Sequence, residues 1–269
     1  MSITTRRELI TPAVASKMLE TNSHNRTIQQ RLVNQYARDM QTGNWREHHQ
    51  GIGFDVNGVL VDGQHRLWAV IEAQTPVWMQ VTRGIAPDAM AGIDVGKIRT
   101  TNDLFTLDGI PRPSRVVPMA VMLSHITRRV AWHTCNTPTK TEVRQTYERF
   151  KEALDWASTG EQSGLPGRLR SASPGCALTM FYLKHPEQAE QFRTLLTVPV
   201  NQAADSPVLA TRTLLERWPK NMGNRRQELL EHMLSGCYSF AMARRIKVVR
   251  SSEEATRYFC SGIGELITR

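Results

Sequence analysis

The sequence predicts an α+β fold, in which a domain with a small mixed sheet is followed by an all-helical part. Two observations support this prediction. Over the first hundred or so residues, helical periodicity alternates with short apolar runs bounded by turn residues. After residue 110, strand signals almost vanish and long helical patterns replace them. We therefore expect one domain at residues 1–110 and a helical domain at residues 111–269.

Two helices are expected before the first predicted strand. Thr11 precedes a proline, as an N-cap does when proline occupies the first helical position, and the helix that it starts ends near Asn22. Thr27 and Gln30 have the spacing of a capping box, which predicts the start of a second helix that Gly43 closes. The buried face of this second helix is marked by Ile28, Leu32, Val33, Tyr36 and Met40.

A hairpin and a further helix follow. Apolar residues at 52–56 and 59–61 flank Asn57-Gly58, which is the strongest short-range hairpin signal. The second strand runs directly into a helical pattern at residues 64–73. The other elements expected in this domain are a buried strand at 77–81, a short helix at 87–93, a polar loop at 94–100 and a helix capped by Thr100 or Thr101 that ends near Gly109.

The second part is expected to consist of helices. Long helical patterns cover residues 116–132 and 140–157, and residues 158–174 are rich in Gly, Ser and Pro, which predicts a loop or hinge. Further helices are expected at residues 175–184, 186–196, 207–218 and 225–245.

Composition limits the classes of partner and compartment. The chain has 34 Lys and Arg against 25 Asp and Glu, a formal net charge of +9. Such a surplus favours polyanions, either nucleic acid or phosphorylated small molecules, although a solvated basic surface is the alternative. The cysteines at 135, 176, 237 and 260 are too widely spaced for paired metal ligands. We expect reduced thiols in a cytoplasmic protein, with no signal peptide and no membrane span.

The segment Asp62-Gly63-Gln64-His65-Arg66 lies between a predicted strand and a predicted helix. A glycine turn at a helix start presents unpaired amide groups, and the helix dipole adds about half a positive charge. An arginine there can bind two phosphate oxygens through its planar fork. The segment therefore predicts a phosphate site. The alternatives are that Asp62 caps the helix, that His65 packs as a neutral side chain against the sheet, and that Arg66 is a surface charge.

These features resemble the N-terminal domain of ParB proteins and their relatives in the ParB/sulfiredoxin-like superfamily. That group includes sulfiredoxins, free-serine kinases and phage or mobile-element proteins labelled ParB-like nuclease domain. The resemblance covers about residues 8–108, and its most specific element is the Gly-x-His-Arg core. The matching segments are Tyr36-Ala37-Arg38-Asp39-Met40 with Gly43-Asn44-Trp45, the hairpin, Asp62 to Leu67, Arg83-Gly84 and Asp94-Val95-Gly96-Lys97.

The resemblance implies a nucleotide pocket for ATP or CTP with Mg²⁺. In this superfamily the turn that matches Gly63, Gln64, His65 and Arg66 wraps the phosphates. Arg26, just before the second helix, lies where ParB-like domains bring an earlier segment to the nucleotide, so we expect it to contact phosphate as well. Sulfiredoxins carry their reactive cysteine where this chain has Gln64, which argues against sulfinic acid reduction.

The candidate catalytic residues follow less directly from the resemblance than the phosphate-binding residues do. Partition ParB proteins carry a Glu-Asn-x-x-Arg element after the last strand, whereas this chain has Asp94-x-Gly-Lys97-x-Arg99. We expect Asp94 to hold Mg²⁺ or orient a nucleophile, and Lys97 and Arg99 to neutralise phosphate charge. His65 and Asp62 are the other candidate catalytic residues. The alternative is a polar loop with solvated charges.

Three functions follow as hypotheses. The first is a nucleoside-triphosphate-binding protein that hydrolyses the nucleotide or transfers a phosphoryl group in a DNA-related phage or mobile-element process. The second is a nucleotide-gated DNA-binding or assembly protein with little catalysis, and the third is a ParB-like DNA nuclease. A homodimer is left open.

Basic side chains outside the turn are candidates for DNA contact. They are Arg168 and Arg170 in the expected hinge, and Arg244 and Arg245 at the end of the last expected helix. Exposed helix faces are the alternative. His48 and His49 form an adjacent pair beside Trp45. Since no third ligand accompanies them, we interpret the pair as part of a polar loop.

Overall fold

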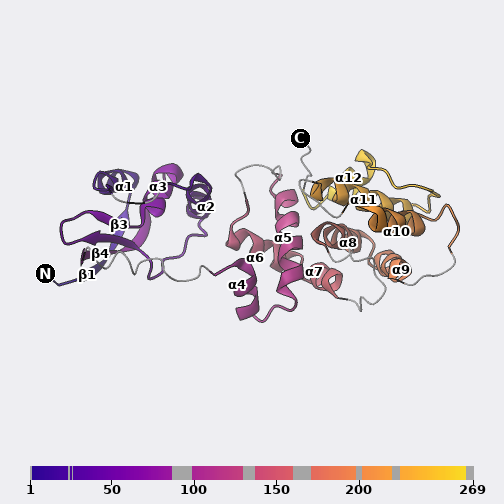
Figure 1. Cartoon of the computed structure of the whole chain (residues 1–269), viewed down its shortest axis with the longest axis horizontal. Helices are drawn as coiled ribbons and strands as arrows, with labels where there is room; N and C mark the ends of the chain where they lie inside the picture. Colours follow the sequence, from indigo (N-terminus) through magenta and orange to yellow (C-terminus); the bar gives the residue numbers. More distant parts are fainter. Residues whose placement is uncertain are drawn as a thin grey trace. The chain divides into compact units, whose positions relative to one another are not determined.

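The computed structural model shows two compact units, whose elements are labelled in Figure 1. The first unit comprises Met1–Ile98 and Cys135–Thr141, and the second comprises Arg99–Thr134 and Glu142–Arg269. Within the described residues the fold is α+β, with a small mixed sheet and mostly helix elsewhere, as expected. The structure describes residues 2–23, 25, 27–86, 99–129, 137–159, 171–197, 202–219 and 225–264.

The first unit contains a four-stranded sheet in the order β1-β4-β2-β3. β1 pairs with β4 and β2 pairs with β3 in antiparallel fashion, whereas β2 and β4 are parallel. The strands are β1 (Thr4–Ile10), β2 (Ile52–Asp55), β3 (Leu60–Asp62) and β4 (Val77–Ile85).

Two strands differ from expectation. β1 was not predicted, because its sequence Thr-Thr-Arg-Arg-Glu-Leu-Ile is polar and only Ile10 is buried, as an edge strand allows. β4 is longer than the expected strand at 77–81 and only half-buried, since its first five residues alternate between covered and more open positions. The Asn57-Gly58 hairpin joins β2 to β3 as expected, with Gly58 at φ +80°.

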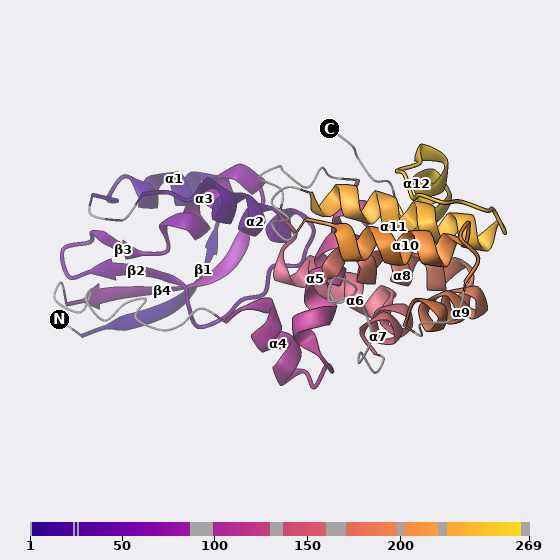
Figure 2. The same ribbon diagram turned by 45° about the vertical axis from the view of Figure 1, so that its right-hand side comes forward.

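Three helices, α1 (Pro12–Leu19), α2 (Gln30–Gln41) and α3 (Gln64–Ala73), cover one face of this sheet (Figure 2). Thr11 caps α1 through its hydroxyl, which accepts a hydrogen bond from the Val14 amide at 3.2 Å. The expected bounds of α3 are confirmed. The capping box of Thr27 and Gln30 is wrong, because the N-cap of α2 is Gln29. The core between sheet and helices includes Ile10, Val33, Met40, Ile52, Leu60, Leu67, Val70 and Val81.

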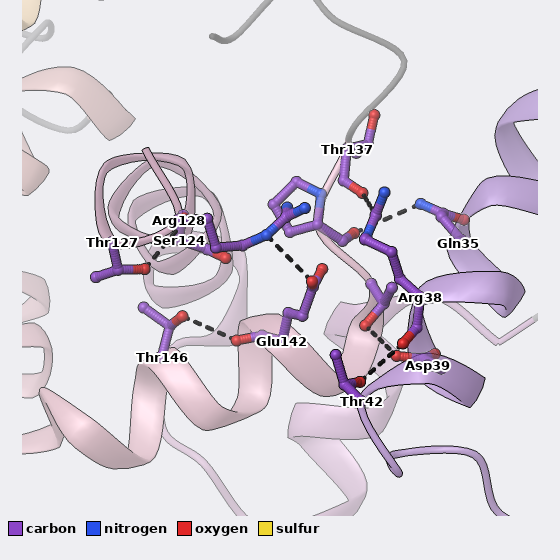
Figure 3. Close-up of polar contacts among 12 residues, drawn as sticks. Gln35, Arg38, Asp39, Thr42, Ser124, Thr127, Arg128, Thr137, Glu142 and Thr146 are labelled. Atoms are coloured by element: carbon purple, nitrogen blue, oxygen red, sulfur yellow. Dashed lines mark hydrogen bonds and ion pairs between the residues drawn. The ribbon is translucent and has the colours of Figure 1, made fainter. Parts of the chain in front are cut away.

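A segment from beyond residue 134 returns to the first unit and binds α2 (Figure 3). The Arg38 guanidinium donates to the Thr137 carbonyl, and the Thr139 hydroxyl donates to Asp39 Oδ1 at 2.9 Å. Gln35 donates to the Pro138 carbonyl at 3.5 Å. Arg38 and Asp39 therefore hold this returning segment.

The second unit is helical within the described residues. Thr100 caps its first helix through a capping box with Asp103, as expected. The pattern at 140–157 forms two helices instead of one, because the backbone leaves the helical conformation at Phe150 (φ −120°, ψ 24°). A last helix after residue 250 was not predicted. The helices are α4 (Thr101–Leu107), α5 (Pro113–Thr127), α6 (Lys140–Arg149), α7 (Lys151–Ser158), α8 (Ala172–Lys184), α9 (Pro186–Thr197), α10 (Pro207–Arg217), α11 (Arg226–Ala241) and α12 (Glu253–Cys260).

Aromatic side chains build much of the second core. Phe181 of α8 meets the rings of Phe192 and Phe259 edge to face, with centroids 5.8 and 5.7 Å apart. In the part of the chain that the structure describes, no helix has the length and apolar character needed to cross a membrane.

Candidate functional site

The turn between β3 and α3 depends on Gly63. Its backbone lies in the left-handed region (φ +98°, ψ 4°), which glycine adopts without steric cost. A Cβ there would meet the Gly51 carbonyl oxygen and the Ile52 Cα, each at 3.1 Å. The chain therefore turns into α3 in close contact with β2, as only glycine permits.

Asp62 acts on this turn without capping the helix. Its Oδ1 accepts a hydrogen bond from the Gly63 amide at 2.6 Å. The N-cap of α3 is Gly63, so no side chain caps the helix. The interpretation of Asp62 as the helix cap is therefore wrong.

Arg66 lies in the first turn of α3 and is mostly covered, with 12% of its side-chain surface exposed. Its Nη1 donates to the Gly51 carbonyl at 2.8 Å and lies 3.6 Å from Asp62 Oδ1. The interpretation of Arg66 as a plain surface charge is wrong. A guanidinium has five N–H donors, and the contacts described here involve only Nη1. The hydrogen bond to Gly51 therefore uses one of these five donors.

An upstream segment, described at residues 21–23, 25 and 27–29, is bound to the start of this helix. The Asn22 amide donates to Gln64 Oε1 at 3.2 Å, and the Gln29 backbone N–H donates to His65 Nε2 at 3.0 Å. Both acceptor side chains are buried, with 4% of Gln64 and 6% of His65 exposed. Since Nε2 of His65 accepts a hydrogen bond, this nitrogen cannot donate to a phosphate at the same time. His65 thus positions the upstream segment.

Asn25 fixes the same segment to β3. Its side-chain amide donates to the Leu60 carbonyl and to Asn22 Oδ1, both at 2.7 Å. The Leu60 amide in turn donates to the Thr21 carbonyl at 3.2 Å. Sequence reasoning missed Asn22 and Gln29 as parts of the site. The run of polar residues between two helices was the one signal that could have indicated them.

A polar cavity of about 690 Å³ lies between β1, β4 and residues 47–49. Gly51, which accepts from Arg66, packs directly against Gln80 in the wall of this cavity. His48 also lines it, and its pKa is lowered by burial, then by the Arg66 charge and by His49. The fold thus keeps a neutral imidazole within the electrostatic reach of Arg66.

The described residues offer neither a cluster of metal ligands nor a reactive thiol. Within the described ranges, no group of three or more His, Cys, Asp or Glu is placed to hold a metal ion. Cys176, Cys237 and Cys260 are buried. Burial raises the pKa of the Cys176 and Cys237 thiols, so both are poor nucleophiles.

Several predicted residues lie outside the described residues or belong to the second unit. Arg26, Asp94, Lys97, Arg168 and Arg170 lie outside the described residues. Arg99 is exposed just before α4 in the second unit.

The two remaining candidates for DNA contact each lie near a carboxylate. Arg244 binds Glu254 at 3.1 Å and lies 4.8 Å above the ring of Tyr238. Arg245 is 83% exposed and lies 3.6 Å from Asp205. Both remain proposals as DNA contacts.

Comparison of the chain with protein-family models, with curated proteins and with solved structures finds no match.

Proposed function

We propose that the first unit binds the phosphates of a nucleoside triphosphate, ATP or CTP, at the turn from Asp62 to Arg66. The observation that carries this proposal is the start of α3. A left-handed glycine opens this helix without a side-chain cap, and Arg66 is held in its first turn by the Gly51 carbonyl. Helix starts of this kind attract anions, and a fixed guanidinium adds directed donors.

The contacts of the upstream segment support the same proposal. Asn22 contacts Gln64 at the start of α3, and Asn25 contacts Leu60 of β3. At this place the resemblance to ParB-like domains implies a second set of nucleotide contacts. Gly51, which accepts the hydrogen bond from Arg66, also packs against Gln80 of a polar cavity. The base specificity of the nucleotide stays open.

Mg²⁺ fits this site as an ion that the nucleotide brings. Magnesium usually keeps several waters and binds one or two carboxylates together with substrate phosphates. Asp62 is the carboxylate that the described part of the turn offers, and it already contacts Gly63 and Arg66. When bound, the ion would neutralise charge on the phosphates. Asp94, the other proposed ligand, lies outside the described residues.

Ligand-dependent stability tests the binding. Thermal unfolding is followed with ATP, CTP, GTP and UTP, each with Mg²⁺. A nucleotide at 100 times its Kd is expected to stabilise the protein by about 2.7 kcal/mol. Arg66→Ala should abolish the shift. Arg46→Ala is the matched control, because Arg46 is exposed and also donates to a backbone carbonyl, that of Gly43.

A conservative variant separates charge from geometry. Arg66→Lys keeps the positive charge but loses the planar fork, so we expect most of the nucleotide shift to disappear. The proposal fails if no nucleotide shifts the wild type, or if Arg66→Ala responds as the wild type does.

Release of inorganic phosphate tests the proposed chemistry, which is hydrolysis or phosphoryl transfer. Phosphate released by the wild type but not by Arg66→Ala would support an enzyme. Binding without release would instead support a protein whose conformation the nucleotide controls.

A further inference from the structure

The second unit contains a small cavity of about 290 Å³ between the end of α10 and the chain that follows α11. Its walls are mainly apolar and include Leu214, Trp218 and Val249. Val249 is buried, whereas its neighbour Val248 is 67% exposed at the rim. The size lies at the lower end of the range for ligand pockets, which suits one planar group better than a large molecule.

Two cations flank the apolar walls. Arg217 and Lys247 both line the cavity and are exposed, and neither forms an ion pair with any described residue. No acidic residue is among the described residues of the lining. Two neighbouring arginines differ from Arg217 and Lys247 because each has an acidic partner. Arg212 binds Glu216, and Arg245 lies near Asp205.

Trp218 provides a surface for stacking. Its ring lines the cavity, and His232 meets it edge-on with centroids 5.3 Å apart. The indole Nε1 is buried and has no hydrogen-bond partner in the part of the chain that the structure describes. A buried donor of this kind favours a ligand or water that carries an acceptor.

We infer that this cavity binds single-stranded nucleic acid, with one base inside against Trp218 and the flanking phosphates on Arg217 and Lys247. Aromatic stacking combined with cations along the backbone is how proteins hold single strands without sequence preference. The net charge of +9 favours a polyanion over a small neutral ligand. A duplex keeps its bases stacked inside, so it cannot place one in this cavity.

The test measures binding of a short fluorescein-labelled oligothymidylate to the full chain by anisotropy over a range of salt concentrations. The double variant Arg217→Ala/Lys247→Ala should bind more weakly, and the slope of log affinity against log salt should fall by about 1.4, which is about 0.7 for each phosphate contact. Trp218→Leu should weaken binding by about 5- to 150-fold. The control Arg225→Ala/Arg257→Ala removes the same charge from exposed side chains elsewhere in this unit.

Three results would overturn the inference. These are an unchanged salt slope in the cavity double variant, equal affinity of the wild type for a duplex of matching sequence, or no binding of the oligonucleotide at all. If benzoate stabilises the wild type but not the double variant while the oligonucleotide fails to bind, the cavity takes a small apolar acid instead. The inference concerns residues of the second unit and does not rest on the triphosphate site proposed for the first unit, which is tested separately by nucleotide-dependent stability.

Discussion

Replacing Gly63 by alanine tests the geometry on which the proposed phosphate site depends. A left-handed backbone costs a non-glycine residue about 1–2 kcal/mol. In Gly63→Ala the new Cβ would also lie 3.1 Å from the Gly51 oxygen and from the Ile52 Cα. Both are backbone atoms, which cannot rotate away, and such overpacking costs a further ~1–3 kcal/mol. We therefore expect Gly63→Ala to lower the free energy of unfolding by ~2–5 kcal/mol.

Gly43→Ala is the matched control for this measurement. Gly43 also has a positive φ of +70°, but a Cβ there would meet nothing within 4 Å. Its substitution should cost the conformational part alone, about 1–2 kcal/mol. Both glycines belong to the first unit, so urea unfolding followed by circular dichroism compares the same transition. Equal losses in the two variants would refute the close approach of the turn to β2.

Three further predictions concern both units. In α11, a Cβ on Gly236 would lie 2.2 Å from Thr211 Oγ1, so Gly236→Ala should lower the free energy of unfolding by ~1–3 kcal/mol. In a double-mutant cycle measured by urea unfolding, adding Thr211→Ala should recover part of this loss, whereas additive losses would contradict the contact. Burial and a neighbouring carboxylate raise the pKa of Tyr147 to about 12, so the stability that its neutral form contributes is present below pH 10 and should be lost as pH rises through 12. The unfolding free energy of the wild type relative to Tyr147→Phe should therefore fall over this range, and a constant difference would contradict it. NMR titration should place the pKa of His48 below 6.5, and Arg66→Ala should raise it; an unmoved pKa would mean that Arg66 does not act on this imidazole.

The elements that could be predicted from the sequence are those with a local signal. Thr11 and Thr100 mark helix starts through hydrogen bonds to residues three positions ahead, and Asn57-Gly58 marks a hairpin within four residues. β1 could not be predicted in this way, because an edge strand needs few apolar residues and takes its stability from pairing with β4, about 70 positions later.

In the candidate site, too, the residues with a local sequence signal could be predicted and those held by distant contacts could not. Gly63 and Arg66 could be singled out from the order of strand, glycine and helix, because that order alone predicts a turn that favours anions. The contacts of Asn22 with Gln64 and of Gln29 with His65 join residues 42 and 36 positions apart. Hydrogen bonds over such separations impose no periodicity on the sequence, so only the folded chain reveals them.

The contact of Arg66 with Gly51 explains how one side chain can serve both the fold and the proposed binding. Its bond to the Gly51 carbonyl attaches the first turn of α3 to the loop that leads into β2. A side chain used in this way loses its rotational freedom during folding, before any ligand arrives. An anion that binds the rest of the fork then need not order the side chain, which favours affinity. The structural contact of Arg66 is therefore a reason to expect binding at this turn, because it prepares the guanidinium in one orientation.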